Sequence, residues 1–242
     1  MKSPFRSIRQ SLLNEGKLLR YLGYAVGEIA LIIIGILFAL KINNMNEDRK
    51  AQAEFDAYVV QLKEDVGKAI ENVNANIDLM EGFLKDAEFV LTFLELPENE
   101  RQDIETFEAG LSILAGYSNP QVQVGLLGQL MDGNIDVIAR DPVLTRRVLA
   151  MESGVEMWLG NLGNVTNRLD LSSQILTSLV GRGRRSKERD RPPKYELKTL
   201  ESSEEFINTC YSIITDMGRF VGFTENILYE LEDFLTVLEE YE

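Results

Sequence analysis

The sequence predicts an all-α protein in which one N-terminal transmembrane helix continues into an elongated antiparallel helical bundle with coiled-coil-like packing. Residues 21–40 form a nearly unbroken apolar run, YLGYAVGEIALIIIGILFAL. At about 1.5 Å per residue, a helix of this length crosses a hydrocarbon core of about 30 Å. Three later segments repeat apolar residues at steps of three and four, the spacing of one helix face. The prolines all lie outside these runs, as expected because an interior proline costs a helix about 3 kcal/mol.

Residues 1–20 form a basic segment before the span. Phe5, Ile8 and Leu12 are spaced to share one helical face, and arginines occupy other positions between them. This pattern predicts a short cationic amphipathic helix that lies on the anionic inner leaflet. The alternative is a basic flank that only sets the orientation of the span.

The span is assigned to residues 21–42, and lysine and arginine are more frequent before its apolar run, residues 21–40, than just after this run. Before it stand Lys2, Arg6, Arg9, Lys17 and Arg20, and after it stand Lys41, Arg49 and Lys50 among several acids. Since basic residues close to a span are retained in the cytoplasm, we predict a cytoplasmic N-terminus and an exported large domain. A cleaved signal peptide would also export the domain, but no A-x-A site follows the apolar core. We therefore expect the span to be retained as an anchor in the lipid bilayer.

Small residues within the span suggest self-association. Gly23 and Gly27 form a G-x-x-x-G pair, and Gly35 and Ala39 continue the set of small side chains. Such residues let two helix backbones approach closely in a membrane. The span is therefore a candidate homo-oligomer interface.

Glu28 is the charged residue of this apolar run, and it shares a helical face with Ile32, Gly35 and Ala39. A carboxylate at membrane depth is costly unless it is protonated, paired or in contact with water. We predict that association turns Glu28 toward its copies or toward a cation of a partner. The alternatives are that Glu28 reaches water at the inner headgroups or, as a minor possibility, that a ring of Glu28 side chains lines a pore.

Residues 21–50, YLGYAVGEIALIIIGILFALKINNMNEDRK, resemble a family of bacterial single-span inner-membrane proteins of similar length. The family pattern around the span is close to Y-A-x-G-E-I-x-L-x-x-x-G-I-L-x-A-L-x-I-N-N-W-N-E-x-R-K, and this chain has Met45 where tryptophan is usual. Residues 126–151, LLGQLMDGNIDVIARDPVLTRRVLAM, are similar to a second block of the family. The resemblance implies an inner-membrane protein of Gram-negative type, with the large domain in the periplasm. It implies no activity.

The helix of the span is expected to continue through residues 43–96 as a stalk that Pro97 ends. Its apolar positions are Phe55, Val59, Leu62, Val66, Ala69, Val73, Ile77, Met80, Leu84, Ala87, Leu91 and Leu94. Residues 97–140 are expected to form short distal helices over 103–115 and 121–131. In the first of these, the inward positions would be Ile104, Phe107, Leu111 and Leu114.

Two further long helices are predicted over residues 141–180 and 203–242. Asp141 and Ser202 or Ser203 are suited to cap their N-termini, and Pro142 suits a first helical position. The apolar row of the second long helix is Leu144, Val148, Met151, Val155, Trp158, Leu162, Val165, Leu169, Leu176 and Leu179. The row of the third is Phe206, Cys210, Ile213, Met217, Phe220, Ile227, Leu231, Phe234, Leu238 and Tyr241.

A basic linker, residues 181–202, joins these two helices. Its basic side chains are Arg182, Arg184, Arg185, Lys187, Arg189, Arg191 and Lys194. If the first long helix leaves the membrane and the second returns, this linker lies near the bilayer. It would then contact anionic headgroups, an acidic partner or a neighbouring protomer. The alternative is a solvated loop.

Composition excludes several function classes. The net charge is −14, and the acidic excess lies after the span, so a nucleic-acid partner is not expected. The chain has no histidine and one cysteine. It therefore lacks the usual zinc ligands, histidine-based catalytic groups and any internal disulfide. We predict no catalytic residue, no metal site and no cofactor.

These patterns predict a membrane-anchored helical scaffold or interaction protein that self-associates or docks another envelope protein. The alternative is a sensory or regulatory subunit with a ligand-binding or partner-binding periplasmic bundle. A receptor needs a second span or a cytoplasmic output module, which a partner would have to supply.

Overall fold

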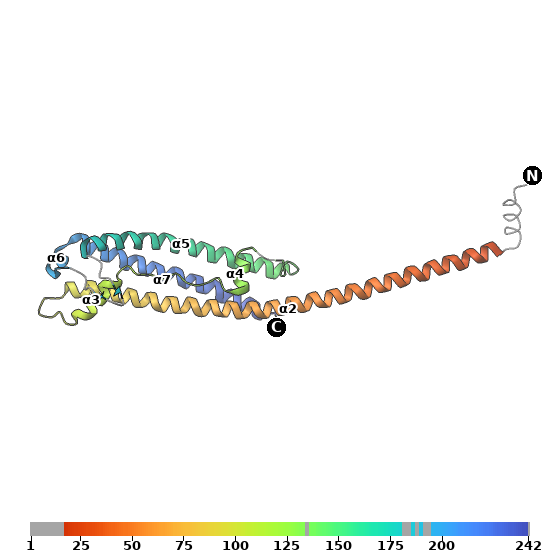
Figure 1. Cartoon of the computed structure of the whole chain (residues 1–242), viewed down its shortest axis with the longest axis horizontal. Coiled ribbons are helices and arrows are strands. Elements are labelled where there is room, and N and C mark those ends of the chain that lie inside the picture. Colours follow the sequence, from red (N-terminus) through yellow and green to blue (C-terminus); the bar gives the residue numbers. More distant parts are fainter. Residues whose placement is uncertain (1–16, 134–135, 181–184, 187–188, 191–194, 242) are drawn as a thin grey trace, which may run out of the picture. The chain divides into compact units, whose positions relative to one another are not determined.

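The computed structural model describes residues 17–133, 136–180, 185–186, 189–190 and 195–241, and the fold is all-α, as predicted. The long helices are α2 (Lys17–Glu95), α5 (Pro142–Val180) and α7 (Glu204–Glu239) (Figure 1). The short ones are α3 (Ile104–Ile113), α4 (Gly125–Met131) and α6 (Leu197–Ser202). Two-residue strands, β1 (Arg185–Ser186) and β2 (Arg189–Asp190), pair antiparallel. By its contacts the chain divides into residues 1–56 and residues 57–242.

The first unit contains the N-terminal part of α2. This helix begins at Lys17, so the last residues assigned by sequence to the basic segment are already helical. The predicted amphipathic helix around Phe5, Ile8 and Leu12 lies outside the described residues. From Lys17, α2 runs without interruption through the apolar segment and into the second unit, where it ends just before Pro97, as predicted.

The core of the second unit is built from the apolar rows of α2, α5 and α7. On α7, every predicted position from Phe206 to Leu238 is buried, whereas Tyr241 is half-buried. α5 and α7 pack closely against each other, and Trp158 of α5 lies 5.7 Å from Phe223 of α7 between ring centroids. On α2, Ile77 and Leu84 are only half-buried, while Asn76, Val90 and Phe93 are buried in addition to the predicted row.

α5 runs in the same direction as residues 57–95 of α2 (Figure 1), whereas the predicted antiparallel bundle required it to run in the opposite direction. Near the start of this part of α2, Asp65 accepts a hydrogen bond from Leu126 N, so the segment after α3 has returned to that end. At the other end, Tyr211 near the start of α7 donates to Glu95. Residues 114–124 therefore cross back along the unit before α5 begins. Only α7 is antiparallel to the other two long helices.

This topology corrects the expected position of the basic linker. The described residues on either side of the linker, the end of α5 and Tyr195, lie at the end of the second unit where α2 ends, not where α2 enters it. Tyr195, directly after the linker, donates a hydrogen bond of 3.0 Å to Glu108 of α3 and packs edge-on against Phe107. The prediction that the linker returns to the bilayer was based on an antiparallel second helix, and this premise is wrong because α5 runs parallel to residues 57–95 of α2. The predicted contact of the linker with anionic headgroups stays a prediction.

Three local predictions are also corrected. Ile104, expected inward, is 45 % exposed, because the helix cap turns the chain at Asp103, whose φ is 67° and whose side chain accepts from Thr106 N. The helix expected from Gln121 begins only at Gly125. The linker expected to reach residue 202 contains α6, whose C-cap Ser203 is also the N-cap of α7. The predicted cap at Asp141 is confirmed, since its Oδ1 accepts from Val143 N and Leu144 N.

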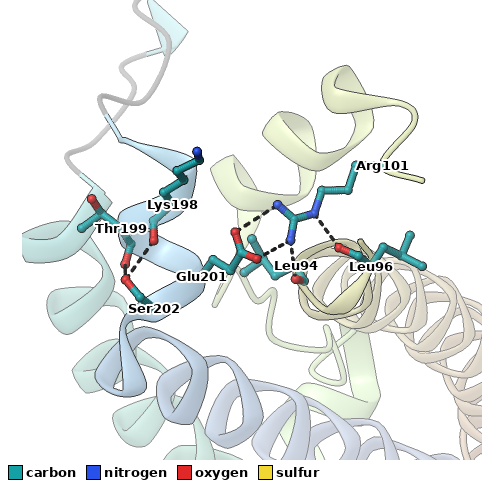
Figure 2. A network of polar contacts seen from close by, with 7 residues as sticks. All are labelled: Leu94, Leu96, Arg101, Lys198, Thr199, Glu201 and Ser202. Atoms are coloured by element: carbon teal, nitrogen blue, oxygen red, sulfur yellow. Dashed lines mark hydrogen bonds and ion pairs between the residues drawn. The ribbon is translucent and has the colours of Figure 1, made fainter. Parts of the chain in front are cut away.

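Arg101 links the end of α2 to α6 through hydrogen bonds (Figure 2). Its side chain is only 7 % exposed, and its guanidinium donates to the carbonyls of Leu94 and Leu96 and to both carboxylate oxygens of Glu201. These hydrogen bonds lower the pKa of Glu201 below its ordinary value. The contact explains why a short α6 forms within a segment that composition alone assigned to a linker.

Candidate functional site

The apolar part of α2 in the first unit has the properties of a membrane span. Within residues 25–95 of this helix, an 18-residue window has a mean hydropathy of 2.4, and none of the window is buried within the chain. The large apolar side chains from Leu22 to Ile42 are about half or more exposed, and Leu31 reaches 71 %. In the described part of the chain, α2 is the one helix that meets these criteria of length and composition. Exposed apolar surface on this scale requires a covering environment.

The candidate association residues of the span, Gly23, Gly27, Glu28, Gly35 and Ala39, are all exposed on α2. A Cβ added at any of the three glycines would meet no other atom within 4 Å. These glycines therefore pack against no other side chain in the described part of the chain. At this face a neighbouring helix can approach the backbone of α2 closely.

The helix face that carries Glu28, Gly35 and Ala39 continues past the span. Ala39, Ile42, Asn43, Met45, Asn46 and Arg49 line a shallow hollow along α2. Within it, Asn43 donates a hydrogen bond of 2.8 Å to Glu47 one turn later. The hollow extends the Glu28, Gly35 and Ala39 face toward the polar end of the span, and it includes the position of Met45.

Most of the predicted basic residues of the linker lie outside the described residues, namely Arg182, Arg184, Lys187, Arg191 and Lys194. The backbones of Arg185 and Arg189 lie in β1 and β2, where Arg185 pairs with Asp190 and Ser186 pairs with Arg189. The predicted contact of this linker with a partner or a neighbouring protomer stays a prediction.

An open groove of about 540 Å³ lies between α5 and α7 in the second unit, and sequence reasoning missed it. Its charged end contains Arg168 of α5 and Asp216 and Arg219 of α7. Asp216 is 5 % exposed, and its Oδ1 accepts from Arg168 Nε at 2.9 Å and from Arg219 at 3.0 Å. The two basic side chains are about half exposed. Helical periodicity predicts the helix on which each of the three residues lies. It does not predict that Arg168 pairs with Asp216, because this pairing depends on how α5 and α7 are aligned along their lengths.

A buried carboxylate at Asp65 positions the start of α4, and this feature was also missed. Asp65 is 3 % exposed, and its Oδ2 accepts from Leu126 N at 2.7 Å. Lys68 and Gln61, on the same helix, contact Oδ1. The residue before Leu126 is Gly125, with a φ of +49°. The role of Asp65 is to satisfy a backbone donor of the incoming chain, which is a structural role.

Cys210 lies in the core with no exposed surface. Burial raises the pKa of its thiol to about 12, so the reactive thiolate is scarce at neutral pH. The interpretation of Cys210 as a small buried apolar residue is confirmed. Within the described residues, no group of three or more aspartate, glutamate, cysteine or histidine side chains is placed to hold a metal ion.

Comparisons with known proteins do not assign a family. A scan against protein-family models, a search of curated proteins and a search of solved structures each found no match to the chain. The resemblance of residues 21–50 to single-span inner-membrane proteins therefore stays a prediction.

Proposed function

We propose that the protein is a membrane-anchored helical scaffold that self-associates in a bacterial inner membrane and presents an acidic helical domain to the periplasm. The observation that carries the proposal is the span itself. The apolar side chains between Leu22 and Ile42 are exposed on α2, and burying them in hydrocarbon contributes roughly 25 cal/mol per Å² of apolar surface removed from water. The described residues supply no cover for these side chains, and the bilayer is the cover that we propose.

Self-association is supported by the small residues that surround Glu28. Gly35 and Ala39 leave room for a second helix beside this carboxylate, which is exposed on an isolated α2. In an oligomer the Glu28 side chains face one another or a partner's cation instead of lipid, and this removes part of the cost of a carboxylate in the membrane. The copies of the second unit are then held together as a multivalent surface that can dock another envelope protein.

A sensory or regulatory function is the second candidate. The observation that favours it is the groove between α5 and α7, because its volume lies within the range of about 300–1,000 Å³ that small-molecule sites occupy. Its cationic end is surrounded by a chain of net charge −14, which makes the groove electrostatically distinct from most of the chain.

Self-association is tested by combining Gly27→Leu with Glu28→Ala in the full-length protein. Added bulk at residue 27 keeps neighbouring backbones apart, and removal of the carboxylate abolishes its hydrogen bonds. Because such interhelical contacts contribute about 1–2 kcal/mol each, we expect the dissociation constant of the oligomer to rise at least about tenfold. Sedimentation equilibrium in a density-matched mild detergent measures this constant.

The control for this experiment is Ile33→Phe. At about 100° per residue, Ile33 lies on the opposite side of α2 from Gly35 and Glu28, so bulk added there should leave the oligomer unchanged. A monomeric wild-type protein would contradict self-association. The same oligomer in all three proteins would contradict the proposed interface.

A further inference from the structure

The groove between α5 and α7 has two chemically different ends. Arg168, Asp216 and Arg219 form the charged end. One helical turn or more away, Leu171 and Ile175 of α5 and Tyr211 of α7 also line the groove. Leu171 is 59 % exposed and Tyr211 is 50 % exposed, so both offer apolar surface to a ligand.

The charged end has an excess of one positive charge. Asp216 is the carboxylate that lines the groove, and it faces the two guanidinium groups of Arg168 and Arg219. Arg168 and Arg219 both contact Asp216 through its Oδ1, and each guanidinium has five N–H donors. Several N–H groups on these half-exposed side chains are therefore directed to the groove or to solvent. Guanidinium donors match the geometry of a second carboxylate.

Three of the hydroxyl groups that line the groove do not compete as donors. Thr209, Ser212 and Thr215 donate their protons to the backbone carbonyls four residues earlier, at 2.7, 3.0 and 2.9 Å. Their oxygens can then only accept hydrogen bonds from a ligand. The positive donors at the charged end are Arg168 and Arg219, so the anionic group of a ligand belongs there.

We infer that the groove between α5 and α7 binds a small organic carboxylate with an apolar body. The carboxylate is held by the guanidinium groups of Arg168 and Arg219, and the apolar body covers Leu171 and Ile175. Asp216 holds the two arginine side chains through hydrogen bonds. It also competes with the ligand carboxylate for their N–H groups. The inference deepens the sensory candidate function. It does not depend on self-association through α2, so the two proposals can fail separately.

The test uses the full-length protein in nanodiscs of zwitterionic lipid, with radiolabelled hexanoate in equilibrium dialysis and empty nanodiscs as background. We expect one hexanoate per chain. Arg219→Gln should weaken binding at least about tenfold, since it removes a charge-assisted hydrogen bond. Asp216→Asn should strengthen binding several-fold, because it removes the competing charge. If Arg168 and Arg219 had a purely structural role, Asp216→Asn would not be expected to strengthen hexanoate binding.

Arg147→Gln is the matched control, since it removes the same charge from an exposed position on α5 outside the groove. Trp158 fluorescence checks that each variant is folded. The inference is overturned by hexanoate binding no greater than that of empty nanodiscs, by equal losses in Arg219→Gln and Arg147→Gln, or by weaker binding in Asp216→Asn. Equal displacement of hexanoate by inorganic phosphate or by hexanol would overturn the assigned ligand class.

Discussion

Replacing Leu31 and Ile34 by arginine is expected to remove the protein from the membrane. Both residues lie near the middle of the apolar run, where they are 71 % and 60 % exposed. An arginine at the centre of an inserted helix costs about 2.5–3.5 kcal/mol, whereas leucine and isoleucine each contribute about 0.3–0.6 kcal/mol in favour of insertion. Two substitutions therefore shift insertion by about 6–8 kcal/mol.

Alkaline carbonate extraction of membranes measures this effect. Wild-type protein should stay in the membrane pellet. The fraction of the double arginine variant in the pellet should be at least about tenfold lower than that of the wild type, as the insertion energies predict. Leu31→Ile combined with Ile34→Leu is the matched control, because it changes the same positions and keeps them apolar. Persistence of the double arginine variant in the pellet at the wild-type level would contradict the assignment of this segment as a span.

Gly125→Ala is expected to produce the largest loss of stability in the second unit. At this position φ is +49°, and an added Cβ would overlap Asp65 Oδ2 and lie 2.8 Å from Asp65 Cγ. The left-handed conformation costs a non-glycine residue about 1–2 kcal/mol, and displacing the buried carboxylate from Leu126 N forfeits a charge-assisted hydrogen bond of about 1.5–3 kcal/mol. We expect a destabilisation of about 3 kcal/mol from these two effects.

Two other glycines separate these contributions. Gly133 has a φ of +84° but no neighbour within 4 Å of an added Cβ, so Gly133→Ala reports the backbone conformation alone. Gly128 lies inside α4, where an added Cβ would make an ordinary contact at 3.5 Å. Urea unfolding followed by Trp158 fluorescence should rank Gly125→Ala as the most destabilised, then Gly133→Ala, then Gly128→Ala. Equal midpoints for Gly125→Ala and Gly133→Ala would show that Asp65 does not restrain the loop.

Helical periodicity predicted much of the fold because the long helices bury one continuous face. The α7 row from Phe206 to Leu238 is fully buried, and the caps at Asp141 and Ser203 were identifiable from residue type alone. Both kinds of signal are local in sequence. They locate helices and their inward faces, but they carry no information about which helix end lies beside which.

Most of the misses depend on contacts between residues distant in sequence. Asn76 replaces Ile77 as a buried residue of α2 because its side chain donates to Ser118 O, 42 positions away, at 2.6 Å. Asp65 is buried because the returning chain supplies a backbone donor for it at Leu126. The same return of residues 114–124 sets the direction of α5, and hence the position of the basic linker. The α5–α7 groove depends on the pairing of Arg168 with Asp216, which no local pattern encodes.

The most direct test of the account asks whether the two sides of α2's apolar segment lie on opposite sides of a membrane. The chain has one cysteine, Cys210, which is buried with a pKa raised to about 12, so it gives little background labelling. Ser7→Cys marks the N-terminal segment, and Ser178→Cys marks an exposed position near the end of α5. Both variants are expressed in Gram-negative cells, converted to spheroplasts and treated with a membrane-impermeant maleimide. The account predicts that Ser178→Cys is labelled at once and Ser7→Cys only after the membrane is permeabilised; labelling of both without permeabilisation, or the reverse order, would contradict it.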